Sequence, residues 1–318
     1  MFRLLNNLQG YAQNGYAGNH LMMADEGDIG TMLGQAGGVT TAAAILAFNK
    51  AAVAPPTITL GYANKGSISV VFPEWTKLAV SVVTSLGSGS DAAEQANAAI
   101  GTTANELSVL RHSVAAQVSD LVAHGGKDDV LLNAGNTLGN VVAAEFDNHV
   151  CNLLDNLDTT VGSATTSMTF GVLMDAVANN EANDAPRPYS AILHPLQVFG
   201  TYGISGEVGQ VASEQGSGAL GNGIIAEGIR NAGFVTRIGG VDIYTSPQTV
   251  STSDQHKGGC YAKTAIGAAV KDTGGGAFIQ VESDRAVRQA STTIVANGYW
   301  NTVELVGTHG CVVHTETS

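Results

Sequence analysis

The chain has 318 residues, which is enough for two ordinary domains or for one elaborated domain with a sizeable core. Charged residues are only 13% of the sequence, against about 25% in typical soluble proteins, and apolar residues are an ordinary 44%, a balance that argues against a disordered chain. The 14 basic and 27 acidic residues give a net charge of -13, which argues against a protein that works by neutralising nucleic-acid phosphates. The largely uncharged surface that this composition leaves favours contact between subunits.

The cysteines give a second constraint. Cys151, Cys260 and Cys311 are far apart and form no C-x-x-C pair, so neither a disulfide framework nor a zinc knuckle is indicated. The first residues turn polar before an apolar stretch of signal-peptide length can form, and the Ala-rich stretch 39–53 is interrupted by polar residues. We expect an unanchored protein in a reducing, cytoplasmic compartment.

The N-terminal part of the chain predicts an extended arm followed by a short helix. Residues 1–38 mix glycines with polar side chains and have no sustained helical or strand period. Residues 42–48 are apolar and follow Thr40 and Thr41, either of which suits a helix N-cap. Pro55 and Pro56 end the helix and mark a boundary, because proline lacks the backbone donor.

Short β-rich runs follow this boundary. They cover residues 57–62, 67–72, 78–83 and 106–118, and a Gly/Ser/Ala segment at 86–101 interrupts them. The simplest arrangement is a long hairpin with a flexible tip.

The longest helical pattern in the chain spans residues 128–157. Its apolar residues recur at spacings of three, four and seven and therefore keep one face: Leu131, Leu138, Val142, Phe146, Val150, Leu153 and Leu157. Asp128 or Asp129 supplies an N-cap and a favourable charge for the helix dipole. About 30 residues make a rod of roughly 45 Å, which we expect to be the structural spine of its domain.

A second helix is predicted at 169–179, with Thr166 or Ser167 as its cap and with Pro186 and Pro188 ending the segment. Residues 189–193 then read as a buried strand.

His194 and Pro195 open another short helix after this strand, since proline suits a first helical position. Residues 203–223 hold seven glycines and predict an exposed, mobile loop, and a short helix follows at 224–231.

The last third of the chain predicts strands. Residues 234–238 and 241–245 flank Gly239-Gly240, a pair that suits a tight primed turn. Further strands are predicted at 265–270, 278–281, 292–296 and 301–306, and around Val312 and Val313.

Two motifs resemble ligand sites but have simpler explanations. Gly216, Gly218 and Gly221 match the dinucleotide fingerprint G-x-G-x-x-G, but the preceding residues are too polar for a central parallel strand, so we interpret the segment as a flexible loop. His309-Gly-Cys311-Val-Val-His314 offers three metal ligands, but on a strand His314 would point away from the other two. An ordinary strand end explains it.

The acidic pairs Asp128 with Asp129, Glu145 with Asp147, and Asp155 with Asp158 all lie on the long predicted helix. Capping and solvated-face roles explain them without catalysis or metal binding. The common hydrolase and nucleotide-binding fingerprints are absent from the sequence. Trp75 and Trp300 are the only tryptophans, and a core role and an interface role suit either of them equally well. No catalytic residue, cofactor or metal ligand is predicted.

The order of these elements resembles that of the tailed-bacteriophage major capsid proteins with the Hong Kong phage-type coat fold. The segments that carry the resemblance are 65–75, 128–157, 189–197 and 239–247. Together they span most of the chain from Thr57 onward.

The resemblance implies an α+β shell protein of five parts. These are an N-terminal arm (1–55), an extended hairpin loop (56–120), a peripheral domain around the spine helix (121–189), an axial domain (190–279) and C-terminal strands that complete the peripheral domain (280–318). Such proteins self-assemble as hexamers and pentamers into an icosahedral head around double-stranded DNA, which they enclose without sequence-specific binding. The expected location is the virion capsid, after assembly in the host cytoplasm.

The family also suggests partners and contacts. The arm is too short and too rich in glycine to be an internal scaffolding segment, so we expect a separate scaffolding protein, together with a portal and decoration proteins. Trp75, Glu74, Lys65 and Lys77 lie in the extended loop and are the candidate intersubunit contacts. Some members form Lys–Asn cross-links from this loop, but no catalytic Glu or partner Asn is marked here, and we expect no cross-link.

Two alternatives remain open. An encapsulin-type bacterial compartment would share the same order of elements and would hold an enzyme cargo instead of a genome. An enzyme with an unfamiliar site would instead bind one small ligand as a monomer or dimer.

Overall fold

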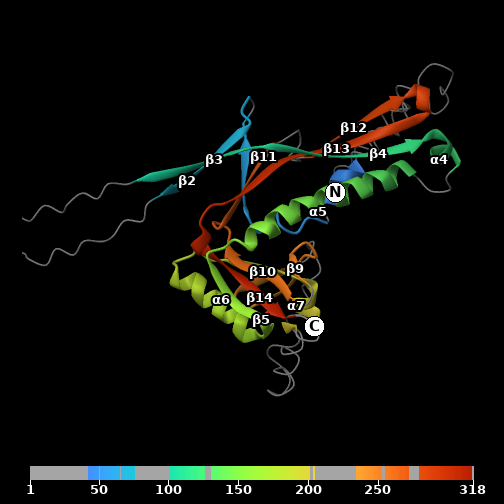
Figure 1. The fold of residues 1–318 in the computed structure, drawn as a ribbon. Helices are drawn as coiled ribbons and strands as arrows, with labels where there is room; N and C mark the ends of the chain where they lie inside the picture. Colours follow the sequence, from blue (N-terminus) through green and yellow to red (C-terminus); the bar gives the residue numbers. More distant parts are fainter. Residues whose placement is uncertain are drawn as a thin grey trace, which may run out of the picture.

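The computed structural model describes residues 42–49, 51–64, 66–75, 101–125, 130–200, 203–204, 234–252, 255–271 and 279–316. Within these ranges the protein is a mixed helix and sheet structure, with two sheets, a projecting hairpin and a long helix between the sheets (Figure 1). Several predictions lie outside the described residues: the arm, the strand at 78–83, most of the hairpin tip, the caps at Asp128 and Asp129, nearly all of the Gly-rich loop with its fingerprint, and the helix at 224–231.

A five-stranded sheet occupies the upper part of the molecule in Figure 1. Its strands run in the order β1-β11-β13-β12, and β4 pairs with β13; their bounds are β1 Thr59–Ala63, β4 Leu110–Ser119, β11 Ile266–Lys271, β12 Ile279–Ala286 and β13 Ser291–Glu304. Along β4, half-buried and exposed residues alternate, as expected of a strand with one face on the core. A short helix, α4 (Asp120–Gly125), and a 3-10 turn, η1 (Val287–Gln289), lie at its far end.

The prediction of two strands at 292–296 and 301–306 is wrong, because β13 is a single strand of 14 residues. Gly298 lies between the two predicted strands. It is instead required inside the strand, because the ring of Trp300 lies where its Cβ would be. Trp300 itself is fully buried, so of the two roles open to this side chain, core and interface, the structure supports the core role.

The long helix α5 (Val130–Leu154) runs beneath this sheet and reaches the second sheet below it (Figure 1). Its predicted apolar face is confirmed, since Leu138, Val142, Phe146 and Val150 are all buried in one core cluster with the upper sheet. Its 25 residues give a length of about 37 Å, so the helix is shorter than predicted and ends before Leu157.

The predicted helix near the N-terminus is confirmed over residues 42–49 and packs against α5. Gly139 on α5 permits this contact, because a Cβ there would overlap the backbone carbonyl oxygen of Ala44. Asp147, about two turns further along α5, is buried, and its carboxylate accepts the backbone N–H groups of Val53 and Ala54 at 2.9–3.1 Å. The solvated role predicted for Asp147 is therefore wrong.

A seven-stranded sheet forms the lower part of the molecule. Its order is β5-β14-β10-β6-β8-β7, and β9 pairs with β10; the bounds are β5 Thr159–Ser167, β6 Tyr189–Leu193, β7 Phe234–Ile238, β8 Val241–Thr245, β9 Val250–Thr252, β10 Gln255–Ala262 and β14 Gly310–Glu316. The helix α6 (Phe170–Ala182) packs on β5, β10 and β14 and closes a second core cluster. Another 3-10 turn, η2 (Gly307–His309), precedes β14.

Local signals in this lower sheet are confirmed at three places. Strand β6 has the predicted bounds and is buried throughout. His194 caps the short helix α7 (Pro195–Phe199), with Pro195 at its first position. Gly239 and Gly240 have φ of 59° and 85°, the positive pair that a primed hairpin turn requires. The cap of α6 is Thr169, not Thr166 or Ser167, and these two residues belong to β5.

The sheets group the chain differently from the predicted domain ranges. Strands β5 and β14 lie in ranges predicted to be peripheral, yet they share one sheet with β6, β8 and β10 of the predicted axial range. Strand β11, also in the axial range, belongs instead to the upper sheet. The division into peripheral and axial domains stays a prediction.

Candidate assembly surfaces

The hairpin of β2 (Ser69–Trp75) and β3 (Thr102–Ser108) projects away from both sheets (Figure 1). The two strands pair antiparallel from Ser69 opposite Ser108 to Trp75 opposite Thr102. A hairpin was predicted here, but the predicted strand at 106–118 is divided, because residues 106–108 end β3 and residues 110–118 belong to β4 of the upper sheet. Among its described side chains only Phe72 is fully buried, and β3 is mostly exposed. A two-stranded hairpin is at best marginally stable alone, and the described residues bury little of this one beyond its base, so the projecting part needs further contacts.

The base of the hairpin is held firmly by the upper sheet. Strand β1 crosses β2 closely at Gly61, where a Cβ would lie 2.6 Å from Val70 and 2.8 Å from Phe72. The ammonium group of Lys271 donates to the carbonyl oxygens of Asn64 and Ser67 at 2.6 and 2.8 Å. These contacts fix the direction in which the hairpin leaves the body.

Of the four candidate contact residues, only Glu74 has a described side chain. It is exposed on β2, one residue before the last described residue of that strand. The backbone of Trp75 is the last residue of β2, but its side chain lies outside the described part, as do Lys65 and Lys77. The structure therefore places two of the four on the projecting strand and does not bring the set together.

A recess of about 340 Å³ lies where the hairpin meets the rest of the chain. Its walls come from β2 (Phe72, Pro73, Glu74) and from the segment after β13 (Leu305, Val306, His309). His309 Nδ1 is hydrogen-bonded to the hydroxyl of Thr264 at 2.8 Å, and burial lowers the pKa of His309 while Glu74 opposes that shift. The recess is therefore a concave surface with both polar and apolar side chains, and Glu74 is one of the residues that line it.

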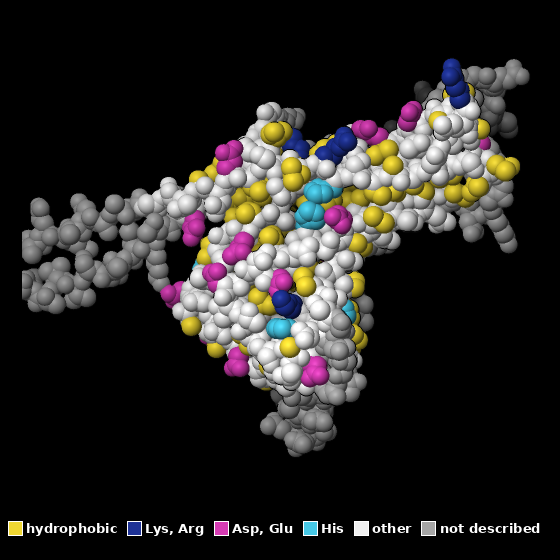
Figure 2. All heavy atoms as spheres, in the orientation of Figure 1, with side chains coloured by type: hydrophobic (Ala, Val, Ile, Leu, Met, Phe, Trp, Pro, Cys, Tyr) yellow, Lys and Arg dark blue, Asp and Glu magenta, His cyan; other side chains and the backbone are white. Residues whose placement is uncertain are grey.

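Exposed apolar side chains are spread over separate ends of the molecule. On the hairpin and at its base, Val71 is 53% and Ile68 72% exposed; at the far end of the upper sheet, Leu121 is 85% and Val287 77% exposed. Phe199 on α7 is 60% exposed in the lower part. Figure 2 shows hydrophobic atoms scattered over the drawn face, with few charged groups among them. Several small contact regions, not one large patch, suit a subunit with many neighbours.

The histidine and cysteine motif at the C-terminal end does not form one site. Cys311 is buried against Cys260 and Ala176, His309 binds Thr264, and His314 is hydrogen-bonded to Gln255 at 3.1 Å. A second group, formed by His112, Glu145 and His149, was not predicted, because His112 on β4 is more than 30 residues from the two helical residues and meets them only in the folded chain.

No described helix is long and apolar enough to cross a membrane.

This architecture defines the class of protein that the chain resembles. Solved structures with the same fold include the capsid of Ralstonia phage GP4, at 14% identity and a TM-score of 0.61 over 82% of this chain and 87% of that one. The capsid of Cyanophage P-SCSP1u is similar at 16% identity and a TM-score of 0.59, over 85% and 90% of the two chains. The chain therefore has the fold of tailed-phage capsid proteins, as the order of elements predicted.

The same fold occurs in a second kind of shell. The holo-SrpI encapsulin complex of Synechococcus elongatus PCC 7942 matches at 10% identity and a TM-score of 0.54, over 80% of this chain and 84% of that one. No sequence-family model and no curated protein sequence matches the chain.

Proposed function

We propose that this chain is the major capsid protein of a tailed phage, and that it self-assembles as hexamers and pentamers into an icosahedral shell around double-stranded DNA. The observation that carries the proposal is the projecting β2–β3 hairpin, which has almost no buried side chains of its own within a fold shared with phage capsids. A segment of this kind needs further packing to be stable, and in this proposal a neighbouring subunit supplies it.

The parts of the chain take different roles in this proposal. In the extended loop (56–120) it is the projecting hairpin of β2 and β3 that lies across neighbours, as does the arm (1–55) before its helix. Residues 42–49 and 51–54 and strands β1 and β4 pack on this chain's own core. The segments 121–189 and 280–318 form the outer, peripheral part of each capsomer, and 190–279 gathers around the local symmetry axis. The exposed apolar side chains at the ends of the molecule support this arrangement, because each end can bury apolar surface against a different neighbouring subunit. The protein then resides in the virion, after assembly in the host cytoplasm.

The acidic composition supports a container that does not adhere to its contents. A net charge of -13 repels phosphate over the molecule as a whole, so the shell encloses DNA without sequence-specific binding. We further propose a separate scaffolding protein, a portal and decoration proteins as partners, since the glycine-rich residues 1–38 are unlike a charged, helical scaffolding segment.

An encapsulin-type compartment is the second candidate function, favoured by the similarity to the holo-SrpI encapsulin complex. The two shells differ in what they contain. Particles purified from the natural source would contain double-stranded DNA if the chain is a phage capsid protein, and a protein cargo with little DNA if it is a compartment shell.

The proposal is tested by expressing the chain with and without its neighbouring reading frames and by imaging the sedimentable fraction. We expect closed hollow particles when the neighbouring frames are present, and irregular or missized assemblies from the chain alone if a scaffolding protein is needed. A stable monomer or dimer under both conditions would contradict a shell function and would favour an enzyme with an unrecognised site. Correctly sized shells from the chain alone would disprove the separate scaffolding protein.

A further inference from the structure

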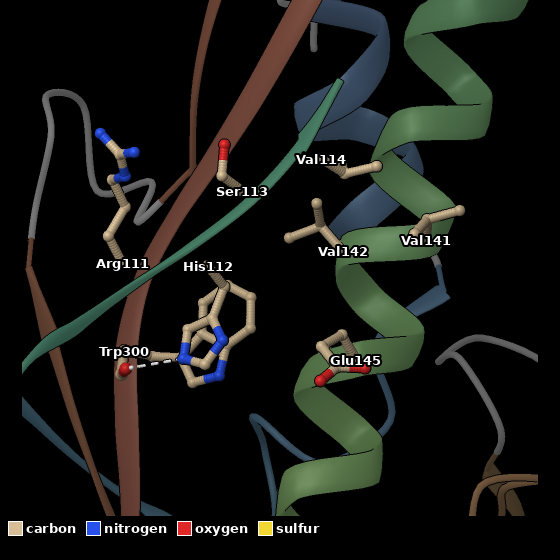
Figure 3. Close-up of a pocket in the computed structure, with 8 residues that line it drawn as sticks. All are labelled: Arg111, His112, Ser113, Val114, Val141, Val142, Glu145 and Trp300. Atoms are coloured by element: carbon tan, nitrogen blue, oxygen red, sulfur yellow. Dashed lines mark hydrogen bonds between the residues drawn. The ribbon is translucent and has the colours of Figure 1, made fainter. Parts of the chain in front are cut away.

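Three side chains that can bind metals meet where strand β4 crosses helix α5. His112 comes from β4, and Glu145 and His149 are one helical turn apart on α5. One nitrogen or oxygen from each residue lies within 4.8 Å of the others. Figure 3 shows the Glu145 carboxylate and the His112 ring facing the same space between the strand and the helix.

The spacing is close to what a metal ion requires. A tetrahedral ion with bonds of about 2.0–2.1 Å holds its ligand atoms roughly 3.3 Å apart. His149 Nε2 and Glu145 Oε1 are already 3.2 Å apart. The ring centroids of His112 and His149 are 4.8 Å apart, so only a short approach of the ligand atoms remains.

His112 is oriented as metal-binding histidines usually are. Its Nε2 lies 3.3 Å from the backbone oxygen of Trp300, and a bond donated there leaves Nδ1 as the free acceptor. The ring also stacks on the buried indole of Trp300, with centroids 4.3 Å apart and planes 11° apart. A backbone carbonyl that accepts from the outer ring nitrogen fixes the tautomer and raises the basicity of the nitrogen that faces the metal.

The surroundings suit a bound ion. His112 is half-buried between β4 and α5, and Glu145 and His149 lie at the edge of the same contact. The open hollow beside the cluster has a volume of about 480 Å³ and reaches Glu145 and His112, which leaves room for a water ligand. Arg111 extends away from the cluster in Figure 3.

We propose that His112, Glu145 and His149 bind one Zn²⁺ ion, with water in the fourth position, and that the ion ties β4 to α5. Two imidazoles and one carboxylate suit Zn²⁺, whereas Ca²⁺ and Mg²⁺ prefer oxygen ligands. The alternative is that Glu145 and His149 form only a surface ion pair and that His112 only packs on Trp300. All three ligands belong to one subunit, so the site does not depend on whether the chain forms shells.

The test is Zn²⁺ binding to the purified full-length chain after treatment with a chelator, measured by calorimetry. We expect one Zn²⁺ per chain and a rise of a few degrees in the melting temperature at saturating metal. Co²⁺ in place of Zn²⁺ should give the intense visible absorption of a tetrahedral site.

Glu145→Gln and His149→Ala should each weaken Zn²⁺ binding at least tenfold and should abolish the shift in melting temperature. Asn152→Ala is the matched control, because Asn152 is an exposed polar residue on the same helix, bonded to Asn148 one turn away. It should bind Zn²⁺ like the unchanged chain. Glu145→Gln alters an exposed position, so it keeps the test valid if His149→Ala does not fold. No stoichiometric Zn²⁺ uptake, or equal binding by Glu145→Gln and the control, would overturn the proposal.

Discussion

At the scale of single residues, Asp147 on α5 is hydrogen-bonded to residues far from it in the sequence. Its carboxylate joins the helix to the backbone of Val53 and Ala54, 94 and 93 residues away in sequence. The three hydrogen bonds satisfy two buried backbone donors, which water cannot reach. The residue therefore anchors the segment after the first helix to the long helix.

Replacing this carboxylate should cost much more than replacing an exposed one. Asp147→Ala leaves two buried N–H groups without an acceptor, and at about 1–3 kcal/mol each the expected loss of unfolding free energy is about 2–5 kcal/mol. Asp155→Ala is the control, since its ion pair with Lys257 is partly exposed and should contribute at most about 1 kcal/mol. Denaturant unfolding of unassembled subunits measures both. Equal losses would contradict the anchoring role.

Asp147 should also make stability depend on pH. Burial raises its pKa to about 6, an effect only partly offset by the hydrogen bonds from Ala54 and Val53. The folded state then holds the proton more tightly than the unfolded state, so this contribution is fully present below about pH 4 and is lost as the pH rises through about 6.

Relative to Asp147→Asn, the unchanged chain should therefore gain stability on acidification from pH 7 to 4, by an amount on the order of 1–3 kcal/mol. Unfolding of the two proteins at matched pH values measures the difference. A difference that does not change with pH, or that has the opposite sign, would show that Asp147 is not held with a raised pKa.

At the scale of elements, the contact between the first helix and α5 depends on a missing side chain. Gly139→Ala would place a Cβ on the carbonyl oxygen of Ala44, and the backbone cannot move aside without separating the helices. We expect a loss of about 1–3 kcal/mol in unfolding free energy. Gly171→Ala in α6 is the control, because its added Cβ meets only the Thr169 hydroxyl oxygen, at 3.5 Å, and alanine favours a helix. Thermal melts in which the two variants behave alike would contradict this packing.

The two tryptophans should separate assembly from folding. Trp75 ends a hairpin strand that projects from the body, so Trp75→Ala should leave the melting of the unassembled subunit unchanged and weaken assembly by about 2 kcal/mol or more per contact. Trp300→Ala removes a fully buried ring and should cost about 3–5 kcal/mol of subunit stability. If Trp75→Ala destabilises the subunit as Trp300→Ala does, then Trp75 belongs to a core and not to an interface.

Elements with strong local signals could be predicted from the sequence, and polar elements could not. The apolar run of β6, the glycine pair between β7 and β8, and the apolar face of α5 all specify their structure over a few residues. Strand β5 was missed because its sequence, TTVGSATTS, is polar and is held by pairing with β14. Strand β10 was missed because it contains two glycines, although both are needed for close packing: Gly259 lets Leu154 approach, and Gly258 lies against the carbonyl oxygen of Ile192.

Of the candidate surfaces and sites, too, some could be predicted from the sequence and others could not. A hairpin in this region could be predicted, because β2 is rich in apolar, β-branched residues, but most of its return strand β3 could not, because the sequence TTANELS is largely polar. The group of His112, Glu145 and His149 could not, since no local spacing relates residue 112 to the helix. The partner of Asp147 was hidden for the same reason, as its hydrogen bonds cross more than 90 residues.

At the scale of the whole molecule, we expect a subunit stabilised by its neighbours as well as by its own two cores. The cores are closed within the chain by α5 and α6, whereas the hairpin and the apolar ends are left exposed. Assembled particles should separate into a single band of subunit size on a denaturing gel, because we expect no Lys–Asn cross-link. A ladder of covalent multimers would contradict that expectation.

The most direct test of the central claim is a cryo-electron microscopy reconstruction of assembled particles. We expect a closed icosahedral shell in which the β2–β3 hairpin of each subunit lies across a neighbouring subunit and buries the exposed face of β3. A stable small oligomer that never closes, or a particle in which the hairpin contacts only its own subunit, would contradict the claim that this chain is a shell protein built around that hairpin.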